Sequence, residues 1–211
     1  SSPSTRAVRT ARRLVVLCVG EALLVGGYLL ATDATVLSAR YVGYPFVWLN
    51  LVVLAVGAID VPRPTDRRTV VAGVIALGYL GVLWWTSGVI APGSGGPVSA
   101  RAVSAIPGWG PMLLVDGPVA VSVIPYEAVG YAGLAVLVYT GVARASAGAL
   151  SGVVGLVTCV SCVGPVLVAT LSGVLGGAST AVAAVSTSAY AYDLSTALFV
   201  LTVAALWTTL R

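Results

Sequence analysis

Residues 14–31, LVVLCVGEALLVGGYLLA, form an apolar run with a single charged side chain. A membrane-crossing helix needs about 20 predominantly apolar residues, and this run is close to that length. The preceding residues 1–12, SSPSTRAVRTAR, are polar and basic, as the start of a signal peptide would be. The apolar run is longer than a signal-peptide core, and no convincing cleavage site follows it. The sequence therefore predicts an uncleaved first membrane span behind a basic cytoplasmic tail.

The composition extends this interpretation to the whole chain of 211 residues. Hydrophobic residues make up 58% of the sequence and charged residues only 9%, whereas about 25% of the residues of an ordinary soluble domain are charged. A chain of this length cannot hide so much apolar surface, so its expected solvent is a bilayer. We predict one domain over residues 13–211, an all-α membrane fold made of a six-transmembrane-helix bundle. The predicted spans are residues 14–31, 44–59, 69–90, 126–143, 148–171 and 190–210.

Residues 91–125 interrupt the succession of apolar runs. They hold six of the eleven prolines, and proline cannot continue a helix because it lacks a backbone N–H and clashes with the preceding turn. The segment still contains two apolar stretches, PMLLV and PVAVSVI. We expect this Pro/Gly-rich segment to be extracytoplasmic, and either interfacial or re-entrant, because non-helical backbone at membrane depth must be buried in protein or face water.

The basic residues, all of them arginine, predict the orientation of the spans. With six spans, one side of the membrane carries both termini and nine of the eleven arginines. These nine are Arg6, Arg9, Arg12, Arg13, Arg63, Arg67, Arg68, Arg144 and Arg211. Because cytoplasmic loops carry the excess of basic residues, we expect a multi-pass plasma-membrane protein with both termini in the cytoplasm. The arginines on that face suit anionic lipid head groups, and nothing in the sequence requires nucleic acid.

The chain contains no histidine, which excludes several kinds of chemistry. This chain alone cannot supply a histidine-ligated haem, copper or zinc, a histidine general base, or a Ser-His-Asp triad. No paired carboxylates at catalytic spacing stand in their place. The sequence therefore assigns no catalytic residue.

Cys159 and Cys162 form a CxxC pair inside the fifth predicted span. Residues three apart on a helix face the same way, and Pro165 is expected to kink the helix beside them. The pair could form a disulfide or bind Cu(I) through two thiolates. The competing interpretation is packing, because cysteines in apolar helices are commonly small buried residues.

Glu21 is a carboxylate inside the first predicted span, and Cys18 lies three residues before it. A carboxylate in a membrane is costly unless it is paired or protonated, which makes it a functional hypothesis by default. Asn50, in the second predicted span, is a candidate partner. One interpretation is a hydrogen bond between Glu21 and Asn50 that joins two helices. The other is proton or cation handling.

Residues 109–131, WGPMLLVDGPVAVSVIPYEAVGY, offer a candidate surface on which another subunit docks outside the membrane. The residues that would carry it are Trp109, Asp116 and Glu127. Two of them also have purely structural interpretations. Asp116 belongs to an Asp-Gly-Pro turn, and Glu127 opens the fourth span, where a negative charge complements the helix dipole.

Together with residues 158–177, TCVSCVGPVLVATLSGVLGG, this run resembles an uncharacterised family of small haloarchaeal membrane proteins. In that family a similar SCVSC-x-x-P run follows a similar PYE-x-x-GY run. The likeness covers residues from about 105 to 177. It implies no established activity, but it implies an association with the aerobic respiratory chain, around haem-copper oxidases.

A second resemblance is to the six-span thiol-redox transporters of the cytochrome c biogenesis and DsbD type, which place cysteines beside prolines in their helices. There the two reactive cysteines lie on different helices. In this chain Cys159 and Cys162 share one predicted helix, and Cys18 has no nearby proline. That departure argues against a transmembrane electron relay.

Three functions remain open from these residues. The first is a non-catalytic accessory or assembly subunit of a membrane complex, with a respiratory oxidase as the candidate complex. The second is an intramembrane thiol–disulfide or Cu(I)-handling protein that uses Cys159 and Cys162. The third is a small transporter that uses Glu21.

Overall fold

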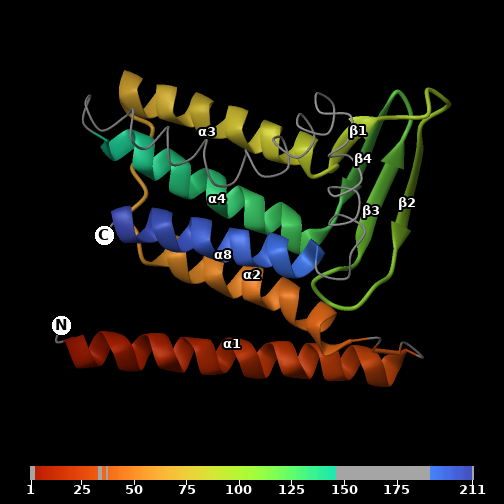
Figure 1. The fold of residues 1–211 in the computed structure, drawn as a ribbon, viewed down its shortest axis with the longest axis horizontal. Coiled ribbons are helices and arrows are strands. Elements are labelled where there is room, and N and C mark those ends of the chain that lie inside the picture. The colour runs from red at the N-terminus through yellow and green to blue at the C-terminus, as the bar shows by residue number, and fades with distance from the viewer. Residues whose placement is uncertain (1–2, 33–34, 37, 146–190, 211) are drawn as a thin grey trace, which may run out of the picture.

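The structure is a computed structural model, and it describes residues 3–32, 35–36, 38–145 and 191–210. In this part of the chain, five helices run side by side and a four-stranded sheet lies at one end of them (Figure 1). The helices are α1 (Pro3–Ala31), α2 (Ala39–Gly57), α3 (Arg67–Thr86), α4 (Pro125–Arg144) and α8 (Ala191–Leu210). Helix α1 begins and helix α8 ends at the end of the bundle opposite the sheet.

Two helices begin where the sequence supplies a start signal. Asp66 caps α3, because its carboxylate accepts a hydrogen bond from the backbone N–H of Thr69 at 3.3 Å. The Thr69 hydroxyl in turn accepts the backbone N–H of Asp66 at 3.2 Å, which completes a capping box. Helix α4 begins with Pro125, whose fixed φ suits the first helical position.

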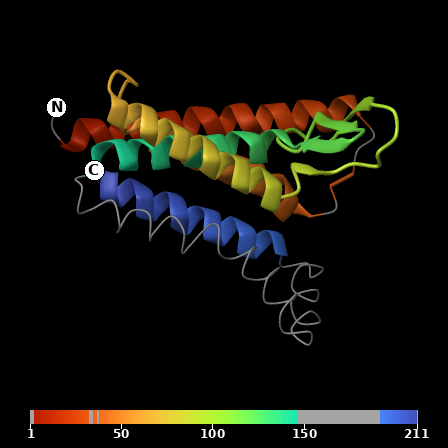
Figure 2. The same ribbon diagram turned by 90° about the horizontal axis from the view of Figure 1, so that it is seen from above.

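The core lies between α4 and the three helices that contact it, α2, α3 and α8. Leu134, Leu137 and Val138 of α4 are almost fully buried there. Two glycines of α4 let α2 approach closely. A Cβ atom on Gly133 would lie 2.1 Å from Cγ1 of Val52, and one on Gly130 would lie 2.5 Å from Cε3 of Trp48. Helix α1, by contrast, lies at the outer edge of the bundle, next to α2 (Figure 1), and α8 lies to one side of α1, α3 and α4 (Figure 2).

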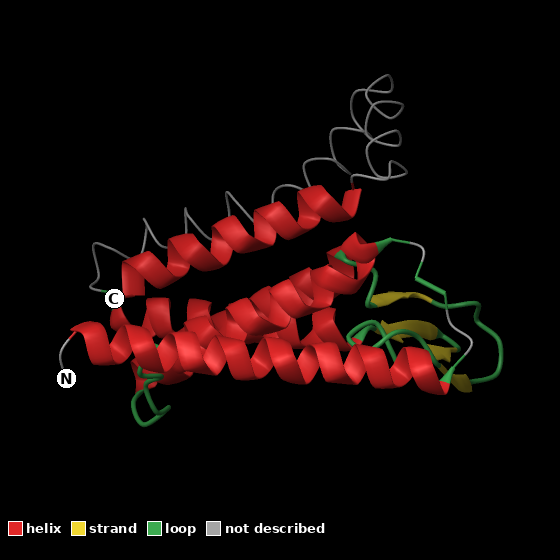
Figure 3. Cartoon of the chain, turned by 90° about the horizontal axis from the view of Figure 1, so that it is seen from below, coloured by secondary structure: helices red, strands yellow, loops and turns green. Residues whose placement is uncertain are grey.

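The sheet is antiparallel throughout, with strand order β1-β4-β3-β2. Its strands are β1 (Ile90–Pro92), β2 (Ser99–Val103), β3 (Met112–Asp116) and β4 (Val119–Val123). Figure 3 shows it beyond the ends of α2, α3 and α4. The register pairs Ser99 with Asp116 and Leu114 with Ser122. Successive side chains of a strand point to opposite faces, so the register assigns each strand residue to one of the two faces of the sheet.

One face of the sheet, the polar face, carries all four polar side chains, Ser99, Arg101, Asp116 and Ser122, together with the apolar Ala91, Val103, Met112, Leu114 and Ala120. The other, the apolar face, carries only apolar side chains: Ile90, Pro92, Ala100, Ala102, Leu113, Val115, Val119, Val121 and Val123.

The sheet corrects the expectation of an all-α fold with a re-entrant or interfacial irregular segment at residues 91–125. Residues 112–116 and 119–123 are short runs rich in β-branched and apolar residues, and two residues join them, which is a hairpin signal. Except for Pro125, which opens α4, the prolines of the segment fall at strand ends and in loops, where a missing N–H does not interrupt the ladder. Apart from the Asp-Gly-Pro turn, the sequence prediction treated the prolines of this segment as helix breakers and did not consider a sheet.

Within the residues that it describes, the structure gives fewer transmembrane helices than the six that we expected. Four of the five described helices are long and apolar enough to cross a membrane: α1 from Ala11, α2, α3 and α4. The apolar part of α8, Ser195–Leu210, is shorter. The predicted fifth span, residues 148–171, lies outside the described residues.

Several predicted boundaries move as well. Helix α1 begins at Pro3, so most of the expected tail is helical, because proline suits a first helical turn and the residues after it include good helix formers. Helix α3 ends at Thr86 rather than near residue 90, since Gly88 has φ +80°, a conformation that ends helices. Ile90 pairs instead with Val121 in the sheet.

Candidate functional site

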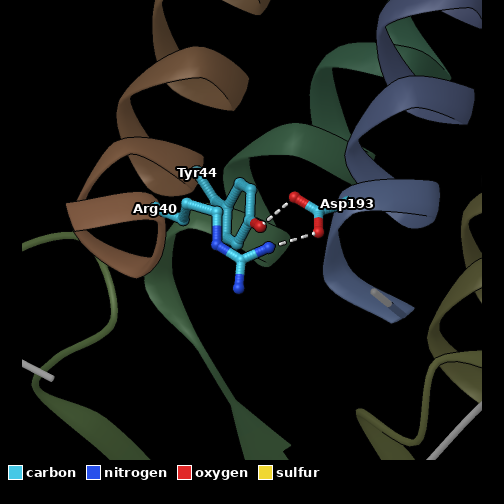
Figure 4. A network of polar contacts seen from close by, with 3 residues as sticks. All are labelled: Arg40, Tyr44 and Asp193. Carbon is cyan, nitrogen blue, oxygen red and sulfur yellow. Dashed lines mark hydrogen bonds and ion pairs between the residues drawn. The ribbon is translucent and has the colours of Figure 1, made fainter. Parts of the chain in front are cut away.

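The candidate site is the end of the bundle where the sheet meets α2, α4 and α8. A polar network there joins the first turns of α2 and α8 (Figure 4). Nη1 of Arg40 lies 2.9 Å from Oδ2 of Asp193, and the hydroxyl of Tyr44 donates to Oδ1 of the same carboxylate. Both side chains of the ion pair are partly exposed, so the pair fixes the geometry of the two helices more than it adds stability.

An aromatic cluster continues this network toward the sheet. The ring centroids of Trp109 and Tyr126 lie 4.9 Å apart, and those of Trp109 and Tyr192 lie 5.4 Å apart. Tyr41 packs edge-on against Tyr192 at 5.8 Å, and its backbone carbonyl accepts the indole N–H of Trp109. These edge-to-face contacts tie α2, α4, α8 and the loop before β3 into one unit.

Gly108 makes the approach of that loop possible. Its φ is +94°, and a Cβ atom at this position would lie 2.4 Å from Cβ of Pro45 in α2. Only glycine adopts this conformation readily and leaves room for the proline ring. The loop therefore carries Trp109 directly onto the first turns of α2.

Glu127 lies in the first turn of α4 at the edge of this cluster, and its side chain is half-buried. Its Oε1 accepts a hydrogen bond from the Tyr126 hydroxyl at 3.0 Å. The position at the helix N-terminus also suits a negative charge. Through Tyr126, the structure brings two of the three predicted docking residues, Trp109 and Glu127, into the same cluster.

Asp116, the third predicted docking residue, lies elsewhere and organises a turn. Its Oδ1 accepts the backbone N–H of Ser94 at 3.1 Å and that of Gly117 at 2.9 Å. These hydrogen bonds to Ser94, and then to Gly117, lower the pKa of Asp116 below its ordinary value, because they stabilise the charged form. Asp116 thus joins β3 to the loop after β1.

The predicted contact between Glu21 and Asn50 is present. Nδ2 of Asn50 donates to Oε2 of Glu21 at 3.1 Å, which links α1 to α2. Cys18, three residues before Glu21 in α1, is exposed. In the described residues, no group of three Cys, Asp or Glu side chains could hold a metal ion. Cys159, Cys162 and Pro165 lie outside the residues that the structure describes.

Sequence reasoning missed the Arg40–Asp193 pair and the part played by Tyr192. A signal for it was available: Arg40, Tyr44 and Trp48 recur every four residues and so lie on one face of α2. Trp48 completes that face, because its ring stacks on Phe199 of α8 at 3.8 Å and its indole N–H donates to Thr196 at 3.2 Å. The partner, helix α8 with Asp193 in its first turn, could not be paired with that face from sequence alone.

Several helices of membrane-spanning length and composition, with a small antiparallel sheet at one end, are compatible with a membrane protein. Residues 2–210 match a family of unknown function, DUF7546, and the chain belongs to that family. Comparison with curated proteins and with solved structures finds no match.

Proposed function

We propose that the chain is a non-catalytic accessory or assembly subunit of a membrane complex, and that it docks on its partner through the apolar face of the sheet. The observation that carries this proposal is the exposure of that face. The side chains of Leu113 and Val119 are 46% and 51% exposed, and Ala100 and Ala102 beside them are exposed too. Contiguous apolar surface of this kind marks sites of protein–protein contact.

The location of the exposed residues separates them from the apolar surface that lipid would cover. Exposed valines and leucines on α1 and α3 belong to helices of membrane-spanning length, where a hydrocarbon environment accounts for them. The sheet lies beyond the ends of α2, α3 and α4 (Figure 3). Its open strand edges exclude it from hydrocarbon, because unpaired backbone groups cannot be satisfied there. A protein partner, rather than lipid, is therefore expected to cover the apolar face of the sheet.

The charges support an extracytoplasmic location for this surface. The loop between α2 and α3 carries Arg63, and Arg67, Arg68 and Arg144 lie at the same end of the bundle, opposite the sheet. The sheet end carries only Arg40 and Arg101 of the described arginines. By the positive-inside rule, this distribution supports a cytoplasmic location for the arginine-rich end and an extracytoplasmic location for the sheet.

The partner that this surface fits is the water-exposed domain of another subunit with an apolar patch of its own. The sequence resemblance to haloarchaeal membrane proteins makes a respiratory oxidase the first complex to test. The Glu21–Asn50 hydrogen bond supports this role over transport, because it gives the intramembrane carboxylate a partner in the neighbouring helix.

Copurification from native membranes in mild detergent tests the proposal. We expect the tagged chain to retain a haem-containing complex, visible by absorbance, at a fixed ratio. The double substitution Leu113→Glu and Val119→Glu should release that complex, because it adds charge to the apolar face. Ser99→Glu, on the polar face of the same sheet, is the matched control and should retain it. A wild-type chain that purifies alone, or equal loss in both variants, would contradict the proposal.

A further inference from the structure

The polar face of the sheet holds an open cavity of about 490 Å³. Its lining includes Arg101 of β2, Asp116 of β3, Ser122 of β4 and Gly88, which follows α3. Leu114, Val115, Ala120 and Val121 form the apolar part of the same lining, and Ser99, two residues before Arg101 in β2, adds a second hydroxyl. The cavity thus combines one cation, one carboxylate, two hydroxyl side chains and an apolar floor.

Arg101 is the group in this cavity that has no protein partner among the described residues. Its side chain is exposed and makes no ion pair or hydrogen bond in that part of the chain. Asp116 lies on the same face and keeps its charge, but it makes no ion pair with Arg101; its Oδ1 accepts the N–H groups of Ser94 and Gly117 instead. A guanidinium with five free N–H donors is suited to two-pronged binding of a phosphate or carboxylate.

The cavity lies at the depth where lipid head groups are expected. Gly88, in its lining, comes just after the end of α3, a helix long and apolar enough to cross a membrane. Trp85, in the last turn of that helix, is 60% exposed. Exposed tryptophans at the ends of spanning helices sit at the membrane–water interface. A phosphate group carried by the lipid surface would therefore be level with Arg101.

We propose that Arg101 and the polar face of the sheet form a binding site for a phosphate group, and that an anionic lipid head group on the sheet side of the membrane supplies it. This site lies on the opposite end of the bundle from the arginine-rich loops. It occupies the face of the sheet that the docking surface leaves free, so one sheet can hold a subunit on one side and a lipid on the other.

Binding of a short-chain lipid to the full chain in detergent tests the site. The probe is dihexanoyl phosphatidylglycerol, titrated and followed by native mass spectrometry. We expect Arg101→Gln to bind it about tenfold more weakly, since a hydrogen bond to a charged group is lost. Arg63→Gln removes one exposed arginine from the loop at the other end and should bind as the wild type does. Arg101→Lys, which keeps the charge, should bind with intermediate affinity.

A second titration with inorganic phosphate, at constant ionic strength, separates the two sources of the phosphate group. If phosphate displaces the lipid only weakly, the lipid head group is the ligand. If phosphate displaces it at a similar concentration and is itself sensitive to Arg101→Gln, the site takes free phosphate, and the assignment to a lipid is wrong. Unchanged binding in Arg101→Gln, or equal loss in Arg101→Gln and Arg63→Gln, would overturn the site.

Discussion

Helix α4 and the sheet that precedes it are continuous in the chain, yet the fold uses them in opposite ways. Helix α4 is the most buried of the described helices that are long and apolar enough to cross a membrane: 61% of the residues in its apolar stretch are buried. It contacts α2, α3 and α8. The sheet leaves Leu113 and Val119 about half exposed on its apolar face. The difference fits the proposal that α4 holds the bundle together while the sheet binds a partner. Stability and binding should therefore respond to different substitutions.

The largest effect should come from Leu137→Ala, at a fully buried position of α4. Truncation of a buried leucine removes apolar burial and leaves a cavity, so we expect a loss of about 2–5 kcal/mol in the free energy of unfolding. Leu77→Ala is the control, since Leu77 of α3 is 69% exposed. Denaturant unfolding in detergent measures both variants. Equal losses would contradict the central position of α4.

Gly133→Val should destabilise the bundle by about 1–3 kcal/mol, because it overpacks the contact between α4 and α2. A side chain there meets Val52, whereas a Cβ atom on Gly78 of α3 meets no atom within 4 Å. Gly78→Val carries the same cost in helix propensity and serves as the control. Thermal unfolding of the two variants in the same detergent gives the comparison. If Gly78→Val were the more damaging, the α2–α4 contact would be misplaced.

A smaller effect is expected at the sheet end of the bundle. Asp193→Asn removes the charge that pairs with Arg40, and pairs this exposed contribute about 0.2–1 kcal/mol. A double-mutant cycle with Arg40→Gln isolates that pairwise free energy. A coupling near zero would mean that packing of the aromatic cluster, rather than the ion pair, fixes α8 against α2.

The smallest effect should be the pH dependence that Asp116 contributes. Its hydrogen bonds to Ser94 and Gly117 lower its pKa below the ordinary value of 3.8. A lowered pKa in the folded state adds stability above the unfolded-state pKa, and that stability is lost as the pH falls through the folded value. In Asp116→Asn, the stability of the protein should therefore fall less than in the wild type as the pH is lowered through the acid range. Near neutral pH, the stability of the variant should not change with pH. If the melting temperatures of the variant and the wild type fell equally as the pH is lowered, Asp116 would not contribute to the pH dependence of stability.

The helical part of the fold could be predicted because its signals are long and local. Residues 14–31 and 126–143 are apolar runs that read directly as helices, and Pro125 fixes the start of α4. The contact between Glu21 and Asn50 could be predicted as well, because few polar side chains within these helices are available to pair.

The sheet could not be predicted in the same way, because its strands are at most five residues long and lie among prolines. Strand β1 shows the difficulty: it has three residues, ends in Pro92, and pairs with β4 some 30 positions later. The network at Asp193 was hidden for a related reason. It pairs Arg40 with a residue 153 positions away, and no local pattern carries that information.

The central claim is that a partner covers the apolar face of the sheet in the native membrane. The most direct measurement is labelling of Val119→Cys with a membrane-impermeant maleimide, in a variant whose three native cysteines are alanine. We predict rapid labelling of the purified chain and protection in native membranes, whereas Ser94→Cys, at an exposed loop position outside both the apolar face and the cavity lining, should be labelled in both. Equal labelling of Val119→Cys in the two preparations would contradict the claim.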